Sequence, residues 1–299
     1  MILLLILYAL FAVTFILARE AALAVPPVLF IAIRMICAGM LLLGFVRVRT
    51  KEHFVIRRSE LPWFVGIVLF HIYGAYVLEF ISLQYLTAAK VSLLYNLTPF
   101  VTAFFAYLFF KEVLSTRKLI GLLVGFTAFI PVLITQPTLQ ESAIKNSFAE
   151  ILLIIAICSS CVGWIFMKKL ITHFKHSYIF VNGIGMFFGG FLALTHSYFF
   201  ETWPPVESLL SNIPFLRSSI LLIFVGNIIC YNLYGKLLHL YSTTTLSFFG
   251  ISTPLFAALF GWLWLSETVN MWFFVTAILA GLGLYIFYKD ELKIKVLKI

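Results

Sequence analysis

Residues 87–100 read TAAKVSLLYNLTPF, and residues 242–255 read STTTLSFFGISTPL. The two stretches align at a constant offset of 155 residues, and the alignment continues beyond each of them. The aligned pairs are Ser92 with Ser247, Thr98 with Thr253, Pro99 with Pro254, Glu112 with Glu267, and the expected helix N-caps Ser115 with Asn270. A Thr-Pro pair with a glutamate 13 residues after the proline, present twice, indicates an internal repeat.

The composition excludes a water-soluble globule. Of the 299 residues, 63% are hydrophobic and only 11% are charged, and the mean hydropathy is +1.07. A soluble domain carries about 25% charged residues, so this chain needs a hydrocarbon exterior. The 33 Phe, 13 Tyr and 6 Trp suit lipid-facing and interfacial surfaces. The sequence therefore predicts an all-α integral membrane protein.

The apolar segments are long enough for membrane-spanning helices, which need about 20 residues each. Shorter alternating segments typical of a membrane β-barrel do not occur in the sequence. The ten expected spans are 2–22, 28–46, 62–83, 88–110, 117–135, 148–167, 177–199, 216–237, 243–265 and 270–288.

The basic residues predict the orientation of these spans. With the N-terminus inside the cell, sixteen Lys and Arg residues fall in the inner loops and tail, and four fall outside. This asymmetry follows the positive-inside rule and agrees with an even number of spans. The net charge of +9 thus reflects topology, and we expect no nucleic-acid partner. We expect a multi-pass protein of the bacterial inner membrane with both termini in the cytoplasm.

The repeat divides the chain into two halves of five spans each. We expect the first repeat at 1–135, the second at 148–288 and a basic cytoplasmic tail at 289–299. Because five is odd, the halves must be inverted relative to each other in the membrane. Inverted repeats are typical of secondary transporters, which bind substrate near the midplane between the halves.

Pro99 and Pro254 lie in the middle of equivalent spans, the fourth and the ninth. Each ring displaces the carbonyl four residues earlier, that of Tyr95 or Gly250. Such carbonyls are tolerated in a membrane only where protein or a cavity satisfies them. Paired prolines favour hinges or cavity lining, and a simple packing kink is the alternative.

Polar residues inside the spans are the candidates for substrate binding, because a buried charge is costly in a bilayer. As alternatives to substrate binding, Arg34 could form a structural salt bridge or reach the membrane interface, and Glu79 could lie at the outer interface. His71 fits a hydrogen-bonded core residue better than a proton relay. The candidate substrate-binding residues are Arg34, Glu79, Tyr95, Asn96, Trp164, Asn227 and Tyr231. Together they suggest a zwitterionic, amino-acid-like solute.

These residues resemble the drug/metabolite transporter superfamily, in particular its ten-helix EamA-type branch. The resemblance covers essentially the whole chain. It is carried by Pro26-Pro27 leading to Arg34 and Ala38-Gly39, by Ala88-Ala89, Ser92, Thr98-Pro99 and Lys111-Glu112, and by their counterparts in the second half. The chain departs from the family's Trp-Gly early in the first span, where it has Ala9-Leu10-Phe11, and from the Gly-Glu after spans four and nine.

The resemblance implies two inverted repeats around a central cavity that opens alternately to each side. We expect a carrier of amino acids or related zwitterions, with a proton or an exchanged solute as possible coupling partner and membrane lipids around it. By analogy with relatives in obligate intracellular bacteria, the alternative is uptake or exchange of S-adenosylmethionine, whose sulfonium would suit Glu79 and aromatic rings.

The alternatives from another class are a non-transporting membrane sensor and an intramembrane enzyme. The sequence contains no G-x-x-x-x-G-K-[ST] phosphate loop and no H-E-x-x-H motif, and Cys158-Ser-Ser-Cys161 has no further metal ligands near it. We therefore expect no enzymatic activity, no cofactor and no metal site.

The topology is tested by cysteine labelling at position 53, in the predicted cytoplasmic loop 47–60. In a variant without the native cysteines, His53→Cys should react with a membrane-impermeant maleimide only after the inner membrane is permeabilised. A cysteine at position 207, in a predicted outer loop, is the control and should react in intact spheroplasts. Labelling of position 53 from the periplasmic side would contradict the orientation.

Overall fold

The structure is a computed structural model that describes residues 2–50, 55–86, 88–128, 143–265 and 271–296. Most helical segments are α-helices, whereas η1, η2 and η4 are π-helices and η3 and η5 are 3₁₀-helices. In chain order the segments are α1 (Ile2–Ala24), α2 (Pro27–Phe45), η1 (Val46–Thr50), α3 (Leu61–Gly66), η2 (Ile67–Gly74), α4 (Ala75–Leu83), α5 (Ala88–Leu94), η3 (Tyr95–Leu97), α6 (Thr98–Phe110), α7 (Thr116–Thr127), α9 (Ala143–Thr172), α10 (Tyr178–Phe200), α11 (Val206–Ser211), α12 (Ile213–Leu221), η4 (Leu222–Cys230), α13 (Tyr231–Leu237), α14 (Thr243–Phe249), η5 (Gly250–Ser252), α15 (Thr253–Leu265) and α16 (Met271–Val296).

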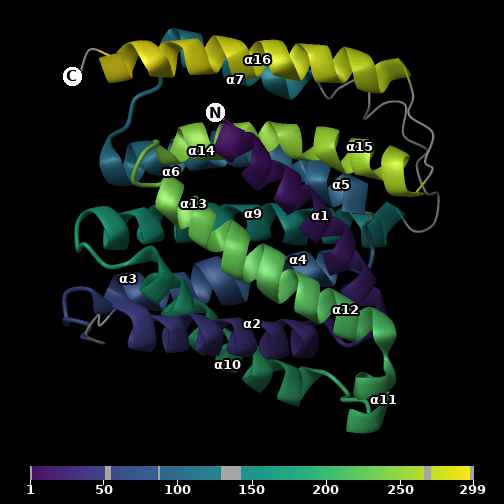
Figure 1. The fold of residues 1–299 in the computed structure, drawn as a ribbon. Helices are drawn as coiled ribbons and strands as arrows, with labels where there is room; N and C mark the ends of the chain where they lie inside the picture. The colour runs from purple at the N-terminus through teal and green to yellow at the C-terminus, as the bar shows by residue number, and fades with distance from the viewer. Residues whose placement is uncertain (1, 51–54, 87, 129–142, 266–270, 297–299) are drawn as a thin grey trace.

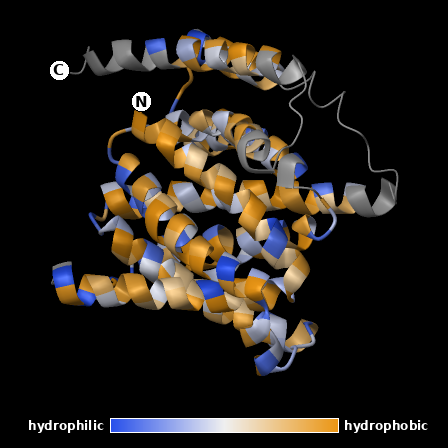
Figure 2. Cartoon of the chain, turned by 45° about the vertical axis from the view of Figure 1, so that its right-hand side comes forward, coloured by the Kyte–Doolittle hydropathy of each residue, from blue (hydrophilic) through white to orange (hydrophobic). Residues whose placement is uncertain are grey.

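Long apolar helices make up the bundle, and the prediction of an all-helical membrane protein is confirmed (Figure 1). Eight helical rods within the described residues are long and apolar enough to cross a bilayer. The fifth and tenth expected spans correspond to α7 and α16, and residues 129–135 of the fifth lie outside the described ranges. Figure 2 shows hydrophobic residues along most of the helices, and Phe104, Phe188 and Phe224 are among those exposed on the surface.

The bundle has a pair of helices at each end in Figure 1, α7 with α16 and α2 with α10. In the second pair, glycines let the backbones nearly touch: a Cβ on Gly39 would lie 2.5 Å from the Phe187 nitrogen, and one on Gly190 2.8 Å from the Ile36 nitrogen. Gly190 follows Gly39, and Phe187 follows Ile36, by the same 151 residues. The crossing is therefore symmetric, as expected for repeat-equivalent helices.

The helical breaks also repeat between the halves. The π-helical segments η2 and η4 begin 155 residues apart, and so do the 3₁₀ segments η3 and η5. A π segment leaves carbonyls that need other donors. Ser159 donates to the Phe70 carbonyl at 2.7 Å, and the Asn232 amide donates to the Ile228 carbonyl at 2.8 Å. The offset found in the sequence thus extends to the irregularities of the backbone.

The prolines lie directly after the 3₁₀ segments, in the first turns of α6 and α15. The 3₁₀ segments Tyr95–Leu97 and Gly250–Ser252 therefore begin at Tyr95 and Gly250, the residues whose carbonyls the prolines were predicted to displace. The segments η3 and η5 contact each other, so the two broken helices cross at their breaks. This crossing lies between the halves.

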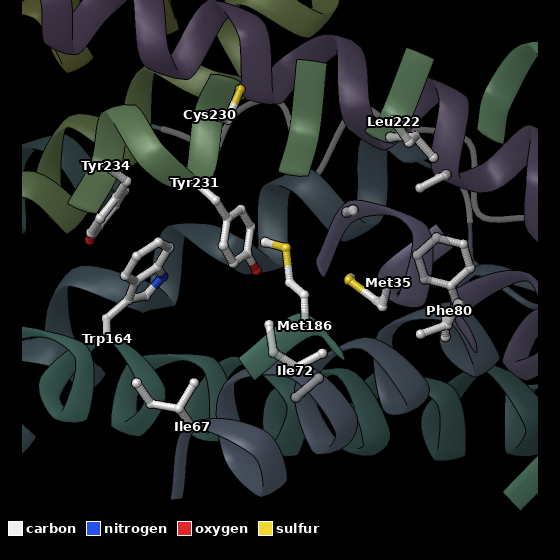
Figure 3. Packing of buried hydrophobic residues seen from close by; sticks show 14 of the residues in the cluster. Met35, Ile67, Ile72, Phe80, Trp164, Met186, Leu222, Cys230, Tyr231 and Tyr234 are labelled. Atoms are coloured by element: carbon white, nitrogen blue, oxygen red, sulfur yellow. The ribbon is translucent and has the colours of Figure 1, made fainter. Parts of the chain in front are cut away.

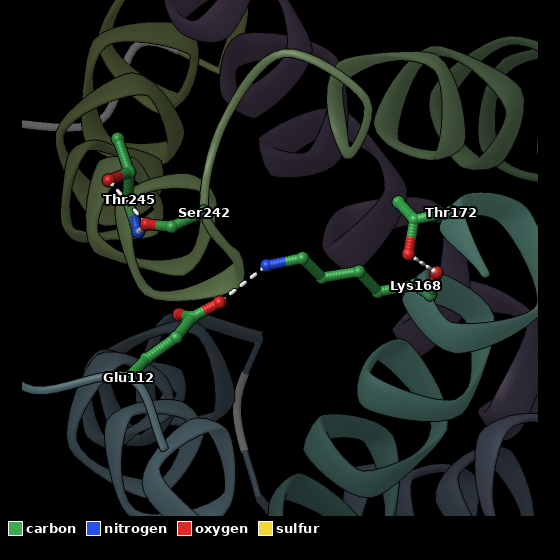
Figure 4. A network of polar contacts seen from close by, with 5 residues as sticks. All are labelled: Glu112, Lys168, Thr172, Ser242 and Thr245. Atoms are coloured by element: carbon green, nitrogen blue, oxygen red, sulfur yellow. Dashed lines mark hydrogen bonds and ion pairs between the residues drawn. The ribbon is translucent and has the colours of Figure 1, made fainter. Parts of the chain in front are cut away.

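The carboxylate of Glu112 joins the two halves through an ion pair. Its Oε1 lies 2.5 Å from the Nζ of Lys168 on α9, as Figure 4 shows. Ser115, three residues after Glu112, caps α7 by accepting a hydrogen bond from the Lys118 N–H at 3.2 Å. The repeat-equivalent Glu267 and Asn270 lie outside the described residues.

Replacing both Pro99 and Pro254 with Ala tests whether the breaks serve movement. Two new i−4 hydrogen bonds should stabilise the helices by about 1 kcal/mol each and slow transport several-fold, while the protein remains folded and inserted. Initial transport rates in proteoliposomes measure the effect. Pro62→Ala is the matched control, because α3 begins after a non-helical segment, whereas Pro99 and Pro254 interrupt helices that continue from η3 and η5. Full transport by the double variant would show that the prolines are only tolerated kinks.

Candidate functional site

A central cavity lies between the two halves, where the broken helices cross. The space between its walls amounts to about 940 Å³, counting the part that opens to solvent. Its walls come from α1, α2, α4, η3 and the start of α6 in the first half and from α9, η4, α13, α14, η5 and the start of α15 in the second. Repeat-equivalent positions face it from both sides, such as Thr98 with Thr253 and Tyr95 with Gly250. A midplane cavity between inverted repeats is the usual substrate site of secondary transporters.

Arg34 of α2 brings a positive charge to the wall of this cavity, although only 2% of the residue is exposed. Its guanidinium carbon lies 4.7 Å from the ring centre of Tyr76, 5.2 Å from that of Phe80 and 5.7 Å from that of Phe30. Three rings therefore stabilise the cation through their π faces. Its Nε and Nη2 have no hydrogen-bond partner within the described part of the chain. The arginine is held in place with donors left over.

Glu79 of α4 lines the same cavity and is 8% exposed. The hydroxyl of Tyr95 donates a hydrogen bond of 2.8 Å to its Oε2. Among the described residues, no ion pair within 4.0 Å joins Glu79 to Arg34 or to another base. The site thus presents one positive and one negative group, both buried and not neutralised by direct contact. Such groups are costly in a membrane unless a ligand uses them.

Aromatic rings continue from Arg34 along the cavity wall. Tyr76 stacks near Tyr231 with 6.1 Å between ring centres, and Tyr231 lies 5.1 Å from Trp164. Trp164 stacks in turn on Tyr234 at 3.7 Å. Figure 3 shows Trp164, Tyr231 and Tyr234 together, with Phe80 farther along the core. A planar or cationic group can contact these rings at several points.

Asn227, in the π-helical segment η4, adds an acceptor to the wall. Its Nδ2 lies 3.2 Å from the sulfur of Met35 and 3.7 Å from that of Met186. Its Oδ1 is buried and has no partner among the described residues. Asn96 is different: its side chain is buried next to the first break but is not among those that line the cavity.

Six of the seven candidate binding residues therefore lie on one cavity, and Asn96 does not. Sequence reasoning missed the rings of Tyr8, Tyr76 and Tyr234, which also line it. Tyr76 could have been found, because it aligns with Tyr231 at the repeat offset of 155 residues. Tyr234 aligns in the same way with Glu79, whereas Tyr8 carried no such signal in an aromatic-rich chain.

His71 lies behind the wall and not on it. It is fully buried, with its ring centre 4.3 Å from that of Trp164. A Cβ on Gly163 would lie 2.3 Å from that of His71, so the glycine admits the imidazole. The described residues contain no cluster of three His, Cys, Asp or Glu side chains that could bind a metal ion.

Comparison with known proteins agrees with this arrangement. The EamA-like transporter family matches residues 1–134 and again residues 147–289. A protein of Chlamydia muridarum named S-adenosylmethionine/S-adenosylhomocysteine transporter is 34% identical over 286 residues, which cover 94% of this chain and 88% of that protein. A Chlamydia trachomatis serovar L2 protein of the same name is 33% identical, with 94% and 86% covered.

A solved crystal structure shares the fold, with a TM-score of 0.72 over 95% of this chain and 93% of the other, at 16% sequence identity. The two family matches, one in each half, account for the internal repeat and identify a transporter family, not an enzyme family. This multi-pass membrane protein belongs to the EamA-like transporter family.

Proposed function

We propose that this protein carries S-adenosylmethionine across the membrane and exchanges it for S-adenosylhomocysteine. The names of the two chlamydial relatives favour this substrate over the broader class of amino acids that the sequence suggested first. We keep the cytoplasmic placement of both termini and the inner membrane as parts of the proposal. Movement of the halves about Pro99 and Pro254 would expose the cavity to each side in turn.

The observation that carries the proposal is the unneutralised pair of charges in an aromatic cavity. S-Adenosylmethionine has an α-carboxylate, an α-ammonium, a sulfonium and a purine. The free donors of Arg34 suit the carboxylate, and Glu79 suits the ammonium. The rings that line the cavity suit the sulfonium and the purine. A simple amino acid would leave most of these rings without a contact.

Uptake by proteoliposomes containing the purified full-length protein tests this function. Labelled S-adenosylmethionine should enter, and entry should accelerate when the vesicles are preloaded with S-adenosylhomocysteine. Excess unlabelled methionine should compete poorly, because it lacks the nucleoside. Equal competition by methionine, or uptake of amino acids without uptake of S-adenosylmethionine, would overturn the proposed substrate.

Replacing Glu79 with Gln tests its role in the same assay. The substitution keeps the shape and the hydrogen bond from Tyr95 but removes the charge, so the desolvated contact with the ammonium is lost. The half-saturation concentration should rise at least about tenfold, which corresponds to about 1.4 kcal/mol. Glu207→Gln is the matched control, because Glu207 is exposed on α11, away from the cavity lining. An unchanged half-saturation concentration for Glu79→Gln would contradict a role of Glu79 in binding the ammonium group of the substrate.

A further inference from the structure

The two repeats contribute unequally to the cavity. Through the symmetric crossing of α2 and α10, which relates positions 151 residues apart, Arg34 corresponds to Gly185. At the offset of 155 residues that relates η2 to η4, Glu79 corresponds to Tyr234. Both charged residues of the cavity therefore come from the first half, and the equivalent positions of the second half carry a glycine and a phenol ring.

A row of aromatic rings connects the charged part of the cavity wall with the uncharged part. It begins at the Arg34 guanidinium, which lies over Tyr76, and passes through the repeat-equivalent rings of Tyr76 and Tyr231. It ends at Trp164, whose ring is stacked against Tyr234. Glu79 lies one turn after Tyr76 on α4, so both charged residues are near the beginning of this row, and uncharged rings are at its end.

The aromatic end has hydrogen-bonding groups but no charge among the residues that line it. Thr98 also lines the cavity, and its carbonyl oxygen is 3.8 Å from the sulfur of Cys161, which lies one turn before Trp164 on α9. The Thr98 hydroxyl is buried and finds no partner in the described part of the chain. Flat rings with a spare hydroxyl suit a nucleoside, and they offer nothing that would compensate a carboxylate.

We propose that the substrate lies in one orientation, with its amino-acid group at Arg34 and Glu79 and its nucleobase at Trp164 and Tyr234. The orientation rests on the proposed function, since carboxylate and purine are at opposite ends of S-adenosylmethionine. The sulfonium, which joins these ends, then lies along Tyr76 and Tyr231. Rings favour a cation there only modestly, so the neutral thioether of S-adenosylhomocysteine also binds, as exchange requires.

Photolabelling of the wild-type protein tests the orientation without any substitution. The probe is 8-azido-S-adenosylmethionine, whose reactive group is on the base. After irradiation and peptide mapping, the label should lie on α9 and α13, around Trp164 and Tyr234, and excess S-adenosylmethionine should prevent it. Protected labelling confined to the segments around Arg34 and Glu79 would overturn the orientation.

Two substrate fragments give a second test by equilibrium binding to the purified protein. 5′-Methylthioadenosine carries the nucleoside without the amino acid, and S-methylmethionine carries the sulfonium amino acid without the nucleoside. Trp164→Leu should weaken 5′-methylthioadenosine at least about tenfold more than S-methylmethionine, and Arg34→Gln should do the opposite. Trp164→Phe, which keeps a ring, should restore most of the nucleoside binding.

The outcomes separate the orientation from the proposed function. Equal weakening of both fragments by each variant, or the reversed pattern, overturns the orientation even if S-adenosylmethionine is transported. Crossed fragment effects without transport of the whole substrate would support the two-ended site and overturn the proposed function. Binding of neither fragment to the wild-type protein overturns both.

Discussion

A bilayer offers no hydrogen bonds to the backbone, and this constraint organises the molecule. Helices satisfy it, so breaks are tolerated only where protein or a cavity replaces the lost partners. The four central breaks occur as two repeat-equivalent pairs, η2 with η4 and η3 with η5. Ser159 and Asn232 supply donors to the π segments, and the 3₁₀ segments cross beside the cavity. The position of the central cavity therefore follows from where the helices cannot continue.

The low dielectric of the bilayer also makes the buried charges in the cavity costly. Among the described residues no carboxylate lies at contact distance from the buried Arg34. The rings of Phe30, Tyr76 and Phe80 stabilise this cation without occupying its free donors. Glu79 is likewise held by Tyr95 and not by Arg34. A direct ion pair would lower the cost of both charges but would compete with a zwitterionic substrate. Keeping them apart preserves the site for a ligand that brings both signs of charge.

Much of the fold could be predicted from the sequence, because hydropathy and the repeat offset depend on local patterns. The Thr-Pro pairs located the helical breaks, and the rarity of charge inside the spans singled out Arg34 and Glu79. The side-chain partners could not be predicted in the same way. Asn96 and Tyr95 are neighbours on one broken helix, yet only Tyr95 lines the cavity, since the 3₁₀ turn decides which way each side chain points. The stacking of Trp164 on Tyr234 depends on packing between distant helices, which no periodicity reveals.

The central claim is that the free donors of Arg34 recognise the carboxylate of a nucleoside-linked amino acid. Its most direct test compares the binding of S-adenosylmethionine with that of decarboxylated S-adenosylmethionine, which lacks only this group, by titration calorimetry. The wild-type protein should prefer the carboxylate form by about tenfold to a hundredfold, the range for a hydrogen bond between charged groups. In Arg34→Gln this preference should fall to within about threefold. Equal affinity of the wild-type protein for the two ligands would contradict the account.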